Sequence, residues 1–248
     1  MSVLAVRNLS KSYGGVLAVQ DVSFEVGKGE LLALIGPNGA GKTTCFNMVN
    51  GQLAPNAGDV LLEGRSLRGL APRQIWRLGV GRTFQITATF GSMSVRENVQ
   101  MALLSHHRRL GSFLSQSKKF YVSEADELLA RVGMREQAER TCSVLAYGDL
   151  KRVELAIALA NAPKLLLMDE PTAGMAPAER AQLMRLAADL ARSSGIAVLF
   201  TEHDMDVVFG FANRVVVLAE GRIIAEGDPA AVRADARVRE VYLGTMHA

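Results

Sequence analysis

Four short, almost entirely apolar segments constrain the fold of this chain more than any other feature. They are LLALI (31–35), LLLM (165–168), AVLF (197–200) and RVVVL (214–218). Runs of this kind are typical of strands that are buried on both faces of a parallel sheet. Helical patterns between the last three, as in residues 177–192, predict right-handed strand–helix–strand units. The sequence therefore predicts an α/β protein built on a parallel sheet.

The interval from residue 36 to residue 164 is too long for one crossover connection, which predicts an inserted segment. Residues 86–140 have the pattern of a mostly helical insertion, interrupted by SHHRRLGSFLSQSKK. We interpret this interruption as a solvated loop, with a contact to lipid headgroups as the alternative. Its cations are Arg108, Arg109, Lys118 and Lys119. Ahead of the first apolar run, VLAV and DVSFEVGKGE predict β-strands.

Composition narrows the class of protein. Of 248 residues, 49% are hydrophobic and 21% are charged, which is ordinary for a globular protein with a sizeable core. No apolar run approaches the length of a membrane-spanning helix, and the first ten residues lack a signal-peptide pattern. Cys45 and Cys142 provide neither a disulfide framework nor a zinc spacing, and a net charge of +3 is too small to indicate nucleic acid. We expect a cytoplasmic protein.

The segment GPNGAGKTT directly follows the first buried run and matches the pattern G-x-x-x-x-G-K-[ST]. Glycines allow backbone N–H groups to close around phosphates, and the start of the next helix adds positive potential. We expect Lys42 to face the outer phosphates and Thr43 to offer its hydroxyl to Mg²⁺. The predicted nucleoside triphosphate site consists of Gly36, Pro37, Asn38, Gly39, Ala40, Gly41, Lys42, Thr43 and Thr44.

Polar residues follow other predicted strands. In LLLMDE, Asp169 is placed to hold Mg²⁺ through water and Glu170 to polarise an attacking water, because parallel sheets bind ligands at the carboxyl ends of their strands. Alone, such a pair is usually a helix cap or a surface pair, but the phosphate loop favours the metal site. His203 lies past another strand end in IAVLFTEHD, although a lone histidine is more often structural. Gln85, in GRTFQ, is a weaker candidate at a strand exit.

The stretch LAYGDLKRVELA (145–156) predicts a short helix that begins beside a glycine. Its apolar residues recur at helical spacing, and we expect Lys151, Arg152 and Glu154 to face away from them. Asp149 stands where an acceptor and a negative charge suit a helix N-terminus. The local pattern alone assigns this helix start no function.

Taken together, these segments closely resemble the ATP-binding subunits of ATP-binding cassette (ABC) transporters, from VRNLSKSYGG to RIIAEGDP. The resemblance implies a P-loop NTPase fold with a RecA-like parallel core, an N-terminal antiparallel β subdomain and an inserted α-helical subdomain. It implies a catalytic core with its β subdomain over 1–85 and 149–225, a helical subdomain over 86–148, and a helical tail over 226–248.

The resemblance also implies a role for each site residue. Tyr13 would stack on adenine, and Gln85 would contact Mg²⁺ and sense the membrane partner. Asp169 would stand on the metal side, Glu170 would be the catalytic base, and His203 would be the switch at the γ-phosphate. ATP and Mg²⁺ are thus the implied ligands.

LAYGD occupies the place of the family signature, usually written L-S-G-G-Q, and consists of Leu145, Ala146, Tyr147, Gly148 and Asp149. In this family the signature serves the ATP of a second subunit, and AGMAP (173–177) would link the two subunits. The implied partner is a second copy or a homologous ATPase subunit. Ala146 lacks the usual hydroxyl, and Asp149 replaces the usual glutamine. Asp149 either repels the opposing phosphates or caps its own helix, and the sequence leaves both open.

RTFQ, LAYG, DEPTAGMAP, TEHDM and a terminal VYLG most resemble the ATPases of branched-chain amino acid importers. This implies transmembrane permease subunits, indirectly a periplasmic solute-binding protein, and a peripheral position on the cytoplasmic face of the inner membrane. Urea or amide uptake and lipopolysaccharide export are alternatives, because the substrate contacts the permease and not this chain. The rival class is a soluble cassette ATPase acting on nucleic acid or ribosomes. Its usual second cassette, long coiled coil or zinc insertion is missing here, so we expect no nucleic-acid partner.

Overall fold

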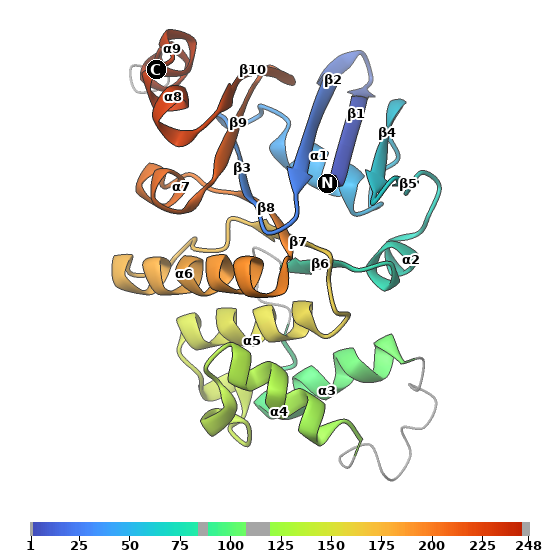
Figure 1. Cartoon of the computed structure of the whole chain (residues 1–248), viewed down its shortest axis with the longest axis vertical. Helices are drawn as coiled ribbons and strands as arrows, with labels where there is room; N and C mark the ends of the chain where they lie inside the picture. Colours follow the sequence, from blue (N-terminus) through green and yellow to red (C-terminus); the bar gives the residue numbers. More distant parts are fainter. Residues whose placement is uncertain (1, 84–88, 108–119, 245–248) are drawn as a thin grey trace.

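The strands form two sheets (Figure 1) in a computed structural model that describes residues 2–83, 89–107 and 120–244. Among these residues the larger sheet has the order β10-β9-β3-β8-β7-β6 and the smaller one β2-β1-β4-β5. The larger sheet contains β3 (Leu31–Ile35), β6 (Val80–Thr83), β7 (Leu165–Asp169), β8 (Ala197–Thr201), β9 (Arg214–Ala219) and β10 (Arg222–Gly227). The smaller contains β1 (Ser2–Tyr13), β2 (Val16–Gly27), β4 (Ala57–Leu62) and β5 (Arg65–Ser66).

Strand directions agree with the predictions. Strands β6, β7, β8, β3 and β9 pair in parallel, and β10 adds an antiparallel edge. The four apolar runs are β3, β7, β8 and β9, so the predicted parallel sheet is confirmed. The smaller sheet is antiparallel throughout, as the resemblance implied.

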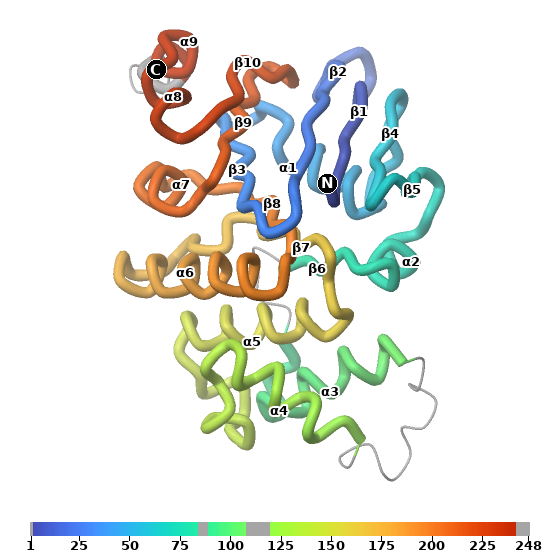
Figure 2. The backbone as a smooth tube through the Cα atoms, in the orientation of Figure 1, coloured from blue at the N-terminus to red at the C-terminus, as the bar shows by residue number. Residues whose placement is uncertain are grey.

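Helices cover the larger sheet and form a separate group at one end of the molecule. α3, α4 and α5 lie together, on the far side of α6 from the smaller sheet (Figures 1 and 2). The helices are α1 (Lys42–Val49), α2 (Pro72–Arg77), α3 (Val95–His106), α4 (Val122–Arg131), α5 (Tyr147–Leu159), α6 (Pro177–Ser194), α7 (Met205–Phe211), α8 (Pro229–Ala234) and α9 (Ala236–Gly244), with 3₁₀ turns at Arg135–Gln137 and Cys142–Val144.

Of these helices, α3 and α4 lie within the predicted helical insertion, and α8 and α9 lie within the predicted tail. The proposed boundary between residues 148 and 149 falls within the first turn of α5, so a single helix belongs to both proposed subdomains. The cationic stretch 108–119 lies outside the described residues. No helix of the described chain is both long enough and apolar enough to span a membrane.

The apolar core divides along the two faces of the larger sheet. In β3, Leu32 and Leu34 belong to the cluster that includes α1 and the smaller sheet, whereas Leu31, Ala33 and Ile35 belong to the cluster formed with α5 and α6. All five are buried. Alternation with period two therefore buries both faces of the strand, which is why its sequence shows no polar position.

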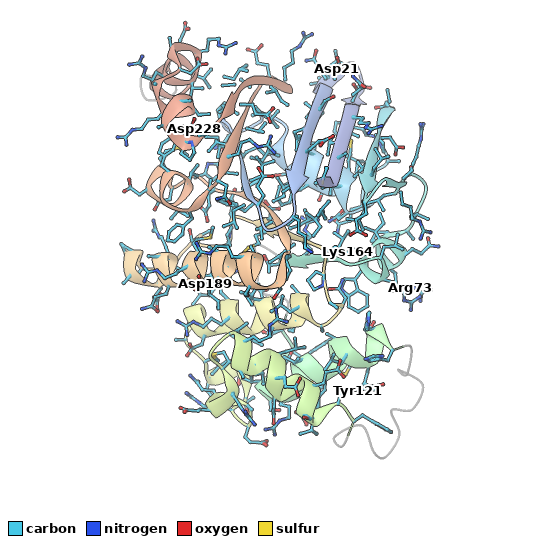
Figure 3. The ribbon with its side chains drawn as sticks, viewed as in Figure 1. Asp21, Arg73, Tyr121, Lys164, Asp189 and Asp228 are labelled. Carbon is cyan, nitrogen blue, oxygen red and sulfur yellow. The ribbon has the colours of Figure 1, made fainter. Side chains whose placement is uncertain are left out.

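An ion pair also joins the core to the smaller sheet. Lys164, ahead of β7, contacts Glu63 in the turn between β4 and β5, and Figure 3 shows Lys164 in the middle of the molecule, above α2. Both side chains are half exposed, and pairs of this kind contribute about 1 kcal/mol or less. Apolar packing therefore holds the two sheets together.

Candidate active site

The phosphate loop connects β3 to α1, and close backbone packing fixes its path. Gly36, Gly39 and Gly41 have φ values of 154°, 81° and 101°. A Cβ on Gly41 would lie 2.4 Å from the carbonyl oxygen of Ala18 in β2, and one on Gly36 would lie 2.1 Å from that of Leu218 in β9. Glycine is therefore required here by backbone packing, in addition to the approach of a phosphate.

Lys42 opens α1 and is 7% exposed. Its ammonium donates hydrogen bonds to the carbonyl oxygens of Gly36 (2.8 Å) and Pro37 (3.0 Å). Burial lowers the pKa of Lys42, and the negative charges of Glu170 and Asp169 oppose that shift. The fold thus brings the loop cation into the field of both predicted carboxylates.

The acidic pair at the end of β7 is held by the strands on either side. The hydroxyl of Thr201, in β8, donates to Oδ1 of Asp169 (2.8 Å) and accepts from the backbone N–H of Glu170 (3.0 Å). From β6, a guanidinium nitrogen of Arg82 lies 3.3 Å from Oδ2 of Asp169. Glu170 has a φ of 45°, a conformation that costs about 1–3 kcal/mol in a residue other than glycine. Such strain clusters at functional sites, and here it turns the chain at the strand end.

A pocket of about 190 Å³ opens over the phosphate loop and includes Glu170 and His203. Nε2 of His203 lies 2.8 Å from Oε1 of Glu170, and the two side chains are 48% and 22% exposed. A carboxylate with this access to solvent can accept a proton from water. The pocket is lined by Ala18, Asn38, Gly39, Ala40, Gly41, Lys42, Thr43, Thr44, Glu170 and His203.

The oxygens at this edge suit Mg²⁺ that arrives with a nucleotide. Mg²⁺ prefers hard oxygen ligands and usually binds through one or two protein oxygens plus phosphates and water. Asp169 offers a carboxylate, and Thr43 offers an exposed hydroxyl in the pocket. No group of three or more His, Cys, Asp or Glu forms a metal cage in the described part of the chain. The donor set therefore fits a nucleotide-borne cation.

Three residues of this site were missed by the sequence analysis. They are Thr201, Arg82 and Glu202, of which Glu202 is 4% exposed. One oxygen of Glu202 accepts hydrogen bonds from the backbone N–H (2.9 Å) and hydroxyl (2.6 Å) of Thr172, and the other accepts from the N–H of His203 (3.2 Å). Glu202 thus ties the chain after β7 to His203. Its available signal was a carboxylate directly after a buried run, in TEHD.

The signature segment lies at the start of α5, whose N-cap is Ala146. Asp149 is in the first turn, as predicted, but no side chain caps this helix. Instead, the carboxylate of Asp149 accepts a hydrogen bond of 3.4 Å from Gln137. The alternative in which Asp149 caps its own helix is therefore wrong.

Two of the three charged residues that we expected to face away from the apolar side of α5 are nevertheless buried. Lys151 and Glu154 are 3% and 4% exposed, and their charged groups lie 3.1 Å apart. The ammonium also lies 5.4 Å from the centre of the Tyr147 ring. Because α5 packs between α3, α4 and α6, its polar side has no solvent to face. Arg152, in contrast, extends to the surface of α6, where its guanidinium donates a hydrogen bond to the side chain of Gln182.

The structure does not bring every predicted residue to the pocket. The signature start instead faces the 173–177 loop, since Tyr147 lies 3.7 Å from a Cβ built on Gly174, while Leu145 packs against the core. Tyr13, at the end of β1, is 50% exposed and is not among the described residues that line the pocket. Gln85 lies outside the described residues.

Comparison with known families and solved structures identifies the class of protein. The family model described as "ABC transporter" matches residues 19–173. An ATP-binding cassette of an ABC transporter in its ADP conformation superposes with a TM-score of 0.89 at 31% identity, over 98% of this chain and 99% of that one. A dimeric cassette bound to ADP and Pi superposes with a TM-score of 0.76 at 25% identity, over 91% and 98%. The chain belongs to the ABC transporter ATPases, and it binds and hydrolyses ATP.

The comparisons also indicate the branch of the family. A model described as "Branched-chain amino acid ATP-binding cassette transporter" matches residues 222–248. The high-affinity branched-chain amino acid transport ATP-binding protein LivG of Salmonella typhimurium is 40% identical over 98% of both chains. The lipopolysaccharide export system ATP-binding protein LptB of Acidithiobacillus ferridurans is 35% identical over 98% of this chain and 97% of its own.

Proposed function

We propose that this chain powers the import of branched-chain or related amino acids through a membrane permease. The observation that carries the proposal is the combination of a complete phosphate-loop edge with 40% identity to an amino-acid transport ATPase along 98% of both chains. The match of the importer family model to residues 222–248 supports the same branch.

In this proposal the chemistry is divided among residues of the pocket and residues beyond its lining. Lys42 binds the outer phosphates, while Thr43 and Asp169 would hold Mg²⁺, which would supply positive charge to stabilise the phosphates during hydrolysis. Glu170 accepts a proton from the attacking water. His203, 2.8 Å from Glu170, keeps that carboxylate oriented and contacts the γ-phosphate. Tyr13 and Gln85 retain their implied roles at adenine and at Mg²⁺.

The signature segment requires a second subunit. In Figure 1, α5 lies on the far side of α6 from the smaller sheet. Its first residue, Tyr147, is 40% exposed. A second copy or a homologous ATPase, facing it head to tail, would place its own ATP against this helix start. ATP would then bind the closed pair of subunits more tightly than the open pair and so favour closure. Hydrolysis of the ATP would allow the pair to open again.

The remaining partners follow from the same proposal. Permease subunits would bind the ATPase at the cytoplasmic face of the inner membrane, with Ile86–Phe90 as the contact, and a periplasmic protein would deliver the solute. Lipopolysaccharide export is the second candidate, favoured by 35% identity to LptB over 98% of this chain.

Solute uptake tests the proposal. A strain lacking this ATPase is complemented with the native chain or with Glu170→Gln, and uptake of labelled leucine, isoleucine, valine and urea is measured. We expect the native chain, and not the variant, to restore uptake of at least one branched-chain amino acid. Restoration of urea uptake or of surface lipopolysaccharide alone would reassign the substrate, and purification with ribosomes in place of a permease would reassign the class.

A further inference from the structure

Arg82 connects β6 to the region around the end of α1 and to Asp169 at the end of β7. It lies on β6, three residues before Gln85, and its side chain is 13% exposed. One guanidinium nitrogen donates to Asn47 in α1 (3.1 Å) and to Gln52 beyond α1 (2.9 Å). Another nitrogen lies 3.3 Å from Oδ2 of Asp169. The guanidinium is therefore fixed by two neutral amide oxygens while it faces one carboxylate.

The charge around Asp169 gives this contact its significance. The side chain of Asp169 is 13% exposed, and a buried anion needs a partner to offset the loss of water. Thr201 supplies a neutral hydrogen bond, and Lys42 directs its own donors to the phosphate loop. Among the residues that the structure describes, Arg82 is the cation that forms an ion pair with Asp169.

We propose that Arg82 is a positioning residue that serves as the resident counter-cation of Asp169 and thereby sets how readily the site accepts Mg²⁺. This inference rests on the proposed role of Asp169 at the metal. Because its amide contacts fasten Arg82 to the end of α1, the guanidinium stays close when a divalent cation arrives. The guanidinium and the metal ion then share one carboxylate, and the positive charge of Arg82 repels the incoming metal ion. Arg82 thus lowers the affinity of the site for Mg²⁺, but it neutralises and orients the Asp169 carboxylate before the metal binds.

A magnesium titration at saturating ADP tests the inference without turnover. Thermal melting is followed together with the fluorescence of Trp76, the single tryptophan, which lies in α2 directly before β6. For Arg82→Gln we expect the Mg²⁺ concentration at half-maximal stabilisation to fall about threefold or more, because one repelling charge is gone. Arg82→Lys keeps a charge and should stay within about twofold of the native midpoint.

Two further variants separate the possible outcomes. Gln52→Ala removes one anchor and leaves both charges, so its midpoint should match that of the native protein. Asp169→Asn should abolish the response to Mg²⁺; if it does not, or if the native protein shows no response, the proposed metal role of Asp169 fails. A native response with an unchanged or raised midpoint in folded Arg82→Gln would overturn the role of Arg82 alone.

The double variant Arg82→Gln/Asp169→Asn covers the case in which Arg82→Gln folds poorly. If Arg82 neutralises Asp169, removing the carboxylate as well should restore a melting transition close to that of Asp169→Asn. If the double variant melts as low as Arg82→Gln, the contribution of Arg82 lies in its contacts with Asn47 and Gln52, and the inference is wrong.

Discussion

The phosphate-loop edge and the start of α5 differ in how much of their surroundings this chain supplies. At the first, Lys42 and Asp169 are buried, and their hydrogen-bond partners come from the loop itself, from β6 and from β8. At the second, Tyr147 and Val144 are 40% and 62% exposed, and the helix start has no side-chain cap.

This difference in burial indicates which site can work within one subunit and which site needs a second subunit. The phosphate-loop edge is preorganised within a single chain, so substitutions there should act even in an isolated subunit. The helix start combines the positive end of a helix dipole with an exposed Tyr147, which suits a phosphate supplied from outside. Substitutions there should act only when a second subunit is present.

The largest effect is expected for Lys42→Ala at the phosphate-loop edge. It removes the cation that faces the outer phosphates while leaving the glycine backbone intact. ATP affinity should fall at least about tenfold and hydrolysis should be lost, as measured by nucleotide titration and phosphate release. Lys28→Ala, at an exposed lysine ahead of β3, is the control and should behave as native. Native turnover in Lys42→Ala would refute the phosphate-loop assignment.

Glu170→Gln should abolish turnover and keep ATP bound. The amide preserves size and hydrogen bonding but cannot accept a proton from water, and a loss of about a hundredfold or more in turnover is expected. With ATP, size-exclusion chromatography should show a dimer that the isolated native chain does not accumulate. Glu240→Gln, at an exposed residue of α9, controls for charge. Hydrolysis at the native rate would mean that Glu170 is not the base.

Lys151→Met tests the buried part of α5. It removes the ammonium that lies 3.1 Å from the buried carboxylate of Glu154, which should lower the free energy of unfolding by about 3–5 kcal/mol. Lys151→Met/Glu154→Leu should recover most of that loss. The matched control is Arg192→Met, at the same spacing in an exposed pair with Asp189, where about 1 kcal/mol or less is expected. Equal losses in both single variants, measured by urea unfolding, would contradict the argument.

The smallest effect is expected for Asp149→Gln in the first turn of α5. Because the carboxylate caps nothing in its own helix and accepts one long hydrogen bond, thermal stability should change little. Removing a negative charge near the opposing phosphates should lower the Michaelis constant for ATP about two- to tenfold, with more ATP-driven dimer. A lower melting temperature with an unchanged Michaelis constant would restore the capping interpretation that the structure excludes.

The local sequence pattern was sufficient to predict an element or a site wherever all the residues that define it lie in one short segment. The four apolar runs predicted β3, β7, β8 and β9, because strands buried on both faces are apolar along most of their length. The phosphate loop was predictable because glycines, lysine and threonine occur together in nine consecutive residues between a strand and a helix. Asp169 and Glu170 followed from the rule that strand ends carry ligands.

What the sequence by itself determined is therefore the parallel core, the phosphate loop and the family to which the chain belongs. Only the tertiary structure decided that Lys151 and Glu154 are buried, that Asp149 contacts Gln137, and that Arg82 faces Asp169. Each of these depends on a partner between 12 and 87 positions away or on helices packed around α5. Periodicity reports which face of a segment is apolar, but the burial of a charge depends on which distant segment covers it.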